Sequence, residues 1–308
     1  MTEELHCNLV GNALDYLLLA GELAQEGSPR LLKHAIATLA DGQELLLKSR
    51  LEVYDWSLLF KNVDEAERSR FEAGEFQSVT FDEAIKRLKG ICGVEVGKGH
   101  LIVLNSLRKH RNKIRHFAIT ADKSEVMSLL TKAYSFALDF VASHLEDHLD
   151  DEAQRYLDAL RKLLGEFDEF VKSRLVEIQA TLAEQNRYSC HVECPGCLQV
   201  TLYADGGEAL CAFCGYRASG EAAADDWFHR HYGHYGPKET MIMMEDMGLE
   251  PCPECGSEAT IPLDSEEETA MHCLSCGVTS YLRKCGRCGN DTYNSFCDYC
   301  RYQMEKDD

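Results

Sequence analysis

The sequence predicts a mainly α-helical protein, in which an N-terminal helical bundle and a long helical connector precede several small β-rich modules. Two observations carry this prediction. Helix-start signals and helically spaced apolar residues run through residues 1–187, whereas the paired cysteines all follow residue 190. The 308 residues suffice for two or three domains, and the 45% hydrophobic content suffices for a sizeable core.

Local capping signals place the helices of the first 187 residues. Ser28 is a helix N-cap, and the proline after it suits the first helical position. Thr80 and Glu83 form a capping box, in which each side chain satisfies the other residue's backbone N–H. Asp122 is expected to start a further helix in the same manner. The helices are expected near 4–25, 29–60, 81–90, 101–117, 123–146 and 150–186.

The last of these helices carries an apolar seam in steps of three and four, which is nearly a heptad pattern with one slip. The seam consists of Leu157, Leu160, Leu164, Phe167, Val171, Leu175, Ile178 and Leu182. It either packs on the helical bundle or pairs with the same helix of a second copy. The charged residues that flank it favour a coiled coil.

Twelve of the fifteen cysteines form six Cys-x-x-Cys pairs. These are Cys194/Cys197, Cys211/Cys214, Cys252/Cys255, Cys273/Cys276, Cys285/Cys288 and Cys297/Cys300. The N-terminus lacks a secretion signal, so the pattern favours metal ligation over disulfides. Two such pairs complete a tetrahedral zinc site. Pairing in chain order predicts about three structural zinc ions, one per four cysteines; nested pairing of the last four pairs is the alternative.

The cysteine pairs predict zinc ribbons, because each of the first two sites has a strand, turn and strand between its pairs. Four cysteine ligands leave no open coordination position, so catalytic zinc is not expected. Cys7, Cys92 and Cys190 are expected to be small buried hydrophobes. His229, His231 and His234 are expected to serve aromatic packing or a binding surface rather than a metal.

The expected organisation has six parts. They are a helical domain at 1–146, a helical connector or coiled coil at 147–187, zinc ribbon 1 at 188–220, a linker with an aromatic and histidine cluster at 221–248, zinc ribbon 2 at 249–281 and a short zinc-binding module 3 at 282–308.

The net charge of −20 argues against general nucleic-acid binding. Residues 188–308 hold 21 acidic against 8 basic residues, a balance of −13, which favours a protein partner for the zinc ribbons. RNA contact would need a local basic patch, and one surrounds the motif described next. Its candidate RNA-binding residues are Lys98, Arg108, Lys109, Lys113 and Arg115.

Two features bear on location. No stretch approaches the roughly 20 apolar residues that span a bilayer. The N-terminus, Met-Thr-Glu-Glu, is acidic rather than basic. A cytoplasmic protein without a membrane segment is expected.

Arg111, Asn112 and His116 carry the candidate chemistry. An arginine can bind two phosphate oxygens, and a histidine can move a proton near neutral pH. Five helical steps turn His116 by about 500° from Arg111, so the two side chains lie roughly 140° apart. One helix does not aim both at one point, whereas two copies across a dimer interface can. This predicts a homodimer.

The run from Leu107 to Phe117 resembles the signature of the HEPN superfamily, which is an arginine and a histidine separated by a short spacer, often with asparagine after the arginine. The resemblance covers about the first 146 residues, including a long helix before the motif. It implies a helical bundle, commonly dimeric, and a metal-independent ribonuclease of toxin–antitoxin, phage-defence or CRISPR systems. It also implies that Arg111, Asn112 and His116 are the catalytic residues. No catalytic role is carried onto Glu44 or Lys48.

Two functions therefore remain open. The first is a metal-independent endoribonuclease, a toxin or phage-defence effector, whose zinc ribbons serve recognition or regulation. The alternative is a non-catalytic HEPN scaffold whose zinc ribbons recruit a partner protein or nucleic acid. The complete Arg-Asn-x-x-x-His run favours the first, because a scaffold does not need it.

Overall fold

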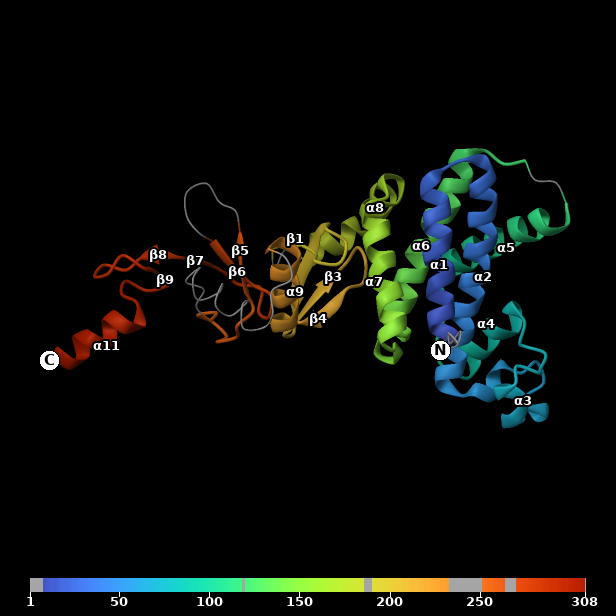
Figure 1. Cartoon of the computed structure of the whole chain (residues 1–308), viewed down its shortest axis with the longest axis horizontal. Helices are drawn as coiled ribbons and strands as arrows, with labels where there is room; N and C mark the ends of the chain where they lie inside the picture. Colours follow the sequence, from blue (N-terminus) through green and yellow to red (C-terminus); the bar gives the residue numbers. More distant parts are fainter. Residues whose placement is uncertain (1–7, 118–119, 186–189, 233–250, 264–269, 308) are drawn as a thin grey trace, which may run out of the picture. The chain divides into compact units, whose positions relative to one another are not determined.

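The computed structural model describes residues 8–117, 120–185, 190–232, 251–263 and 270–307 (Figure 1). The chain divides into two compact units, Met1–Glu177 and Ile178–Asp308. The first is helical, and the second holds small antiparallel sheets, so the predicted fold class is confirmed. No helix among the described residues combines the length and apolar character needed to cross a membrane.

The helices follow the local signals closely. They are α1 Leu9–Glu26, α2 Pro29–Tyr54, α3 Arg68–Glu72, α4 Phe81–Gly90, α5 Lys98–His116, α6 Lys123–His144, α7 Asp151–Gly165 and α8 Asp168–Gln185. Ser28 caps α2 by accepting from the backbone N–H of Leu31. Thr80 and Glu83 form the expected capping box of α4. Asp122 caps α6 by accepting from the N–H of Ser124.

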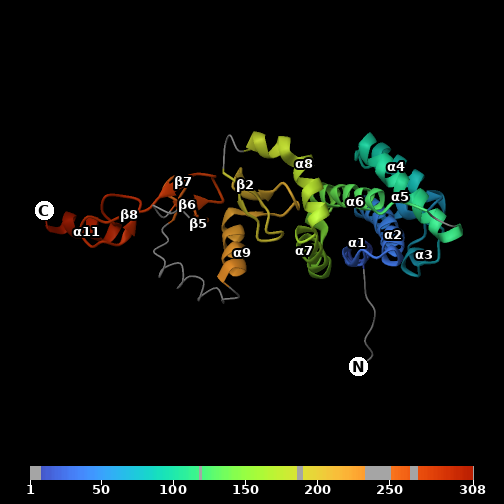
Figure 2. The same ribbon diagram turned by 90° about the horizontal axis from the view of Figure 1, so that it is seen from above.

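Helix α2 is the centre of the first unit. It packs against α1, α4, α5 and α6 (Figures 1 and 2). At Gly42 a Cβ atom would lie 3.1 Å from side-chain carbons of both Tyr16 and Leu17, so a small residue permits the close approach of α1. The Tyr134 side chain is fully buried, and its hydroxyl donates to the Leu17 carbonyl at 2.9 Å, which satisfies this buried donor.

The stretch predicted as one helix from 150 to 186 is two helices, α7 and α8, with a break at Glu166 and Phe167. Helix α7 packs against α1. Its seam residues Leu157, Leu160 and Leu164 are at most 1% exposed, so this half of the seam packs within the chain rather than in a coiled coil. Because α7 packs there, the first compact unit extends beyond residue 146.

The described residues of the second unit form three small antiparallel sheets whose strands follow chain order. The strands are β1 Val192–Glu193, β2 Val200–Asp205, β3 Glu208–Cys211 and β4 Arg217–Ser219, then β5 Thr260–Leu263, β6 Ala270–Cys273 and β7 Thr279–Tyr281, then β8 Arg283–Lys284 and β9 Asp291–Thr292. The expected turn after β2 is present: Gly206 and Gly207 have φ of 59° and 93°, which favours glycine.

Two further helices, α9 Gly220–Tyr232 and α11 Asp298–Asp307, were not expected. The proposed linker at 221–248 therefore begins as a helix; residues 233–250, with His234, lie outside the described residues. Helix α9 packs on β3, β4 and β5 and so contacts the sheets beside the first two cysteine clusters. Its buried Trp227 and Phe228 pair edge to face at 5.4 Å, consistent with aromatic packing.

The start of α9 approaches the second cysteine cluster closely. A Cβ atom on Gly220 would lie 2.1 Å from Ser275 Oγ and 2.6 Å from Ser275 N. The backbone N of Ser275 cannot rotate away. The new methyl group of Gly220→Ala must therefore push α9 off the turn that joins Cys273 to Cys276.

We predict that Gly220→Ala destabilises the protein by about 1–3 kcal/mol, the typical cost of inserting a methyl group into a packed site. The measurement is denaturant unfolding monitored by Trp fluorescence, because Trp227 lies on α9. Gly196→Ala is the matched control, since its Cβ would make only ordinary contacts of 3.6 Å or more. Equal stability of both variants would contradict the close approach.

Candidate functional site

Three groups of four cysteines come together in the second unit, in chain order. They are Cys194, Cys197, Cys211 and Cys214; Cys252, Cys255, Cys273 and Cys276; and Cys285, Cys288, Cys297 and Cys300. Within each group all sulfurs lie within 4.8 Å of one another. Pairing of the knuckles in chain order is confirmed, and the nested alternative is wrong.

The sulfur spacing fits a metal ion. Sγ–Sγ distances across the knuckles are 3.8 Å for Cys194–Cys214, 3.7 Å for Cys255–Cys273 and 3.7 Å for Cys288–Cys297. A tetrahedron with metal–sulfur bonds of about 2.3 Å has edges of about 3.8 Å. A disulfide requires about 2.05 Å, and the described cysteines are all free thiols. The clusters are therefore metal sites in geometry and in donor chemistry.

Local backbone geometry explains why each Cys-x-x-Cys segment turns so tightly. In five knuckles the residue after the second cysteine has positive φ, and its N–H bonds the carbonyl of the first cysteine. Four of these residues are glycines, which adopt this conformation without strain. The Cys-x-x-Cys-Gly pattern was visible in the sequence and marks the turn. The sixth knuckle, Cys297 to Cys300, instead opens helix α11.

Hydrogen bonds prepare individual sulfurs for the thiolate state that binds metal. The backbone N–H groups of Cys288, Cys297 and Arg287 lower the pKa of Cys285 to about 6. Burial raises the pKa of Cys211, but bonds with the other three cysteines and with Thr201 outweigh it and hold the pKa well below its usual value.

The leftover cysteines differ in surroundings. Cys7 lies outside the described residues, and Cys92 is half-buried. Cys190 is not the buried hydrophobe that was expected. It is half-buried, with its sulfur 3.1 Å from Nδ1 of His272, which is fully buried between β5 and β7 and whose pKa burial lowers to about 4. His231 stacks on Trp227 at 4.0 Å and lies 3.3 Å from Glu193.

Helix α5 positions the candidate catalytic residues on two faces. After Leu107, α5 carries no buried residue, so its last turns lie on the surface of the first unit. One face points towards α2 and α4 and carries Arg108, Arg111 and Arg115. The other is exposed to solvent and carries Lys109, Asn112, Lys113 and His116. The expected angular separation of Arg111 and His116 is therefore present.

Two carboxylates of α2 hold Arg111. Its Nη1 donates to Asp41 at 2.9 Å and to Glu44 at 3.2 Å, and the side chain is only 13% exposed. Arg115 also pairs with Asp41, and Lys48 lies 2.9 Å from Glu44. Burial raises the pKa of Glu44, but the hydrogen bonds and charges of Lys48 and Arg111 outweigh it, so the pKa is lowered.

Asp41 is thus a site residue that sequence reasoning missed, and Glu44, which was named without a role, proves to be a partner of Arg111. Their spacing of three residues places them on one helix face. Nothing in the local sequence, however, connects them with an arginine 67 to 70 positions later.

The predicted RNA-binding residues are not equivalent in the structure. Arg108 bonds Asp82 at 2.9 Å, and its guanidinium lies 4.2 Å from the ring centre of Phe81, so it ties α5 to α4. Lys98, Lys109 and Lys113 are exposed. Lys109 and Lys113 share the face of His116, so these two form the basic surface beside the candidate proton-transfer group.

The exposed face of α5 also carries apolar side chains without cover among the described residues. Ile102 is 71% exposed, and Phe117, directly after His116, is 79% exposed. A groove of about 440 Å³ runs beside Ile102 between α5 and α6.

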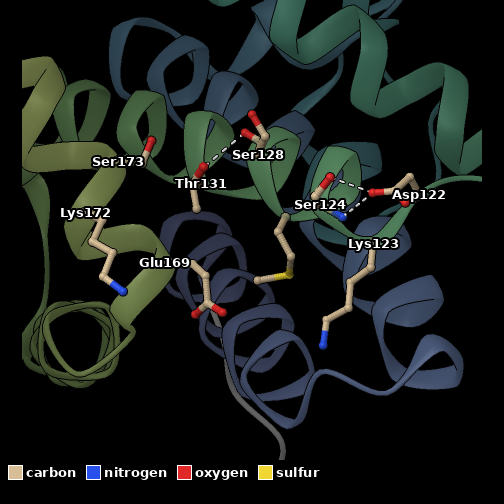
Figure 3. A pocket seen from close by; sticks show the side chains of 9 residues that line it. Asp122, Lys123, Ser124, Ser128, Thr131, Glu169, Lys172 and Ser173 are labelled. Carbon is tan, nitrogen blue, oxygen red and sulfur yellow. Dashed lines mark hydrogen bonds between the residues drawn. The ribbon is translucent and has the colours of Figure 1, made fainter.

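A separate cavity of about 650 Å³ opens between α6 and α8 (Figure 3). Lys123 and Lys172 lie on either side of the Glu169 carboxylate in this view, so the charge of the walls is mixed. None of the candidate catalytic or RNA-binding residues lines this cavity.

Donor atoms of His100, Asp139 and Glu177 also approach one another within 4.8 Å. The guanidinium of Arg174, which is 3% exposed, bonds Asp139 and lies 3.3 Å from Glu177. A guanidinium therefore already pairs with both carboxylates, which are 45% and 44% exposed, so the group is a partly exposed ion-pair network.

Comparisons with known proteins found no match, whether with family models, with curated proteins or with solved structures. The resemblance to the HEPN superfamily accordingly rests on the α5 motif and its helical context.

Metal content gives the first test of the site. We predict about three zinc ions per chain, one for each group of four cysteines. Cys211→Ser should lower the content by about one ion, because three remaining thiolates bind more weakly. Cys92→Ser is the control and should leave the content unchanged. Elemental analysis of reduced, folded protein with one ion or none would contradict the assignment.

A second prediction concerns the carboxylates under Arg111. Glu44→Gln should destabilise the first unit by about 1.5–3 kcal/mol at pH 7, the range for hydrogen bonds to charged groups. The folded pKa of Glu44 is below the ordinary value of 4.5, so its stabilisation is present above that value and is lost as pH falls through the folded pKa. The difference between wild type and variant, measured by chemical unfolding followed by far-UV circular dichroism, should therefore shrink below about pH 4.5.

Glu72→Gln is the matched control, since Glu72 is exposed and pairs only with exposed Arg68 among the described residues. Surface pairs contribute little. If Glu44→Gln lowered the stability by the same amount at every pH, the charge of Glu44 would not be the cause of the loss.

Proposed function

We propose that this protein is a metal-independent endoribonuclease of HEPN type that acts as a homodimer. The observation that carries the proposal is the arrangement of α5. Its last turns present His116, Asn112 and two lysines to solvent, while two carboxylates of α2 hold Arg111 on the adjoining face. Such pre-positioning of a cation by fixed carboxylates suits a site that must receive a phosphodiester.

The proposed reaction is an internal transesterification. The 2′-oxygen of RNA attacks the neighbouring phosphorus, the bond from phosphorus to the 5′-oxygen breaks, and a 2′,3′-cyclic phosphate remains. A base takes the 2′-OH proton, and an acid gives a proton to the leaving 5′-oxygen. In each site one His116 supplies both roles in turn: it takes the 2′-OH proton and then gives it to the leaving 5′-oxygen. DNA lacks the 2′-OH and is not a substrate.

Arg111 stabilises the charge that develops on the phosphate in this proposal. Among the described residues, both of its carboxylate partners bind Nη1, and Nη2 retains donors for a phosphate oxygen. Asn112 binds phosphate or orients the arginine, and Lys109 and Lys113 add positive charge along the strand. Lys98, at the start of α5, is a more distant contact, Arg115 pairs with Asp41 beside Arg111, and Arg108 acts through the position of α5.

The separation of Arg111 from His116 on one helix supports a composite site in which facing helices of two copies each supply part of the machinery. Ile102 and Phe117 offer apolar surface for such a contact. A two-fold interface brings the same patch of both copies together.

In this proposal the metal of the three cysteine clusters is zinc, which four thiolates bind in a closed structural site. The zinc ribbons then serve recognition or regulation. A cytoplasmic toxin or phage-defence effector is the biological role that the HEPN resemblance implies. RNA is the substrate, and a protein that docks on the acidic ribbons is a further partner.

We predict that purified protein cleaves RNA without added divalent metal and leaves 2′,3′-cyclic phosphate or 3′-phosphate ends. His116→Ala should reduce the rate by about 10²–10⁴, the typical effect of removing a general acid or base. Arg111→Ala should have a comparable effect, because charge stabilisation of the transition state is lost. The assay uses labelled RNA, with a 2′-methoxy version as the substrate control. Cleavage of that control at the RNA rate would refute the mechanism.

Mixing the two inactive variants tests whether the site is composite. A heterodimer of Arg111→Ala and His116→Ala chains keeps one site with an intact arginine from one copy and an intact histidine from the other. After complete exchange, about a quarter of wild-type activity should return if opposite copies supply the two groups. No recovery from exchanged dimers would place both groups of each site on one chain.

The non-catalytic scaffold is the second candidate function. The ion pairs that Arg111 already makes favour it. The guanidinium is largely buried and already paired with two carboxylates, as in a purely structural ion-pair network. Retained RNA cleavage by the His116→Ala protein, or none by the wild type, would favour this alternative.

A further inference from the structure

Module 3, residues 282–307, is too small to have an apolar core. Its compact interior consists of the cysteine cluster itself, with Cys285, Cys297 and Cys300 buried together. The module nevertheless carries three aromatic side chains that are exposed: Tyr299 is 71%, Tyr302 53% and Phe296 37% exposed. These aromatic rings are not buried in a core of the module, so a partner can contact them.

Helix α11 arranges two of these rings in a stripe. Tyr299 and Tyr302 are three positions apart, and Lys306 follows four positions later, so the three side chains share one helix face. The ammonium of Lys306 lies 4.4 Å from the ring centre of Tyr302. The stripe thus combines aromatic rings with a cation at one end.

The opposite part of the module adds a third ring and further cations. The ring of Phe296 lies against the first knuckle, where a Cβ on Gly286 would be 3.2 Å from it. Arg301 donates to the Phe296 carbonyl at 3.4 Å. Arg283 and Arg287, on either side of Cys285, are exposed. Figures 1 and 2 show α11 beside the hairpin of β8 and β9.

Charge distinguishes module 3 from its neighbour. Of the eight lysines and arginines after residue 187, five lie at 282–308, whereas residues 249–281 hold seven acidic residues and none that is basic. Two acidic residues of module 3 form ion pairs: Asp291 pairs with Lys284, and Asp298 pairs with Arg301. Residues 282–308 thus hold five basic and five acidic residues and are neutral overall, whereas residues 249–281 have a balance of −7.

We propose that module 3 binds single-stranded nucleic acid, with bases stacked on Tyr299 and Tyr302 and the backbone beside Lys306, Arg283 and Arg287. Exposed aromatic rings accept any base, because every base has a π-face, and nearby cations follow the phosphates. A duplex hides its base faces and is excluded. Stacking does not read the 2′-OH, so RNA and DNA single strands both bind. The proposal does not depend on RNA cleavage by the first unit.

The test is fluorescence anisotropy with the full-length His116→Ala protein, so that cleavage cannot remove the probe. The probe is an unstructured RNA of roughly 12 nucleotides, within the range of small single-strand binding folds. DNA of the same sequence and the RNA duplex are the comparison probes. Tyr299→Ala and Tyr302→Ala should each weaken binding roughly five- to a hundredfold, the range for loss of one stacked base.

Tyr54→Ala is the matched control, since Tyr54 of α2 is 54% exposed, and it should bind like the parent. Tyr302→Phe keeps the ring and should also bind like the parent. Zinc content, measured on every variant, shows that the cluster is retained. The salt dependence should be shallow, because single strands give a slope of only about −0.7 per neutralised phosphate and the module offers few cations.

Equal binding by the parent and the double variant Tyr299→Ala/Tyr302→Ala would overturn the proposal, as would a preference for the duplex. Absence of binding at low salt would overturn it too, and would leave these rings as a protein-docking surface. Loss of cleavage activity alone, with single-strand binding intact, would defeat the proposed ribonuclease and not this inference.

Discussion

The fold of the second unit depends on three clusters, in each of which four cysteine sulfurs lie close together. Its sheets have strands of two to six residues, too few to be stable alone. In the third module the cysteines are the buried cluster itself. Four thiols about 3.8 Å apart gain little from one another, whereas a metal ion among four thiolates supplies folding energy directly. The strands, the knuckles and the docking of α9 beside Ser275 all follow from that one constraint.

The first unit depends on a different constraint, the central position of α2. This helix presents Gly42 to α1 and Asp41 and Glu44 to α5 within a single turn. Burial of a guanidinium without partners would be costly, so the two carboxylates are what permit Arg111 to lie against the bundle. The same contacts set the rotation of α5 and therefore leave Asn112 and His116 facing solvent.

Charge is segregated along the chain. The basic stripe of α5 has two exposed apolar side chains, Ile102 and Phe117, near its two ends. Residues 249–281 hold seven acidic residues and no basic one, whereas module 3 combines cations with exposed rings. A strand held by module 3 would have its bases on tyrosines, while the chemistry proposed for α5 acts on the sugar and the phosphate.

The sequence by itself determined what depends on neighbours a few residues away. The caps at Ser28 and Thr80, and the tight turns of the first five Cys-x-x-Cys knuckles, are interactions across two to four residues and were predicted correctly. The separation of Arg111 and His116 follows from helical geometry alone. Tertiary structure decided which acids hold Arg111, because Asp41 and Glu44 are 67 to 70 residues away. It also decided that the Leu157–Leu164 seam packs against α1, since an apolar stripe has the same pattern whether its partner is the same chain or another.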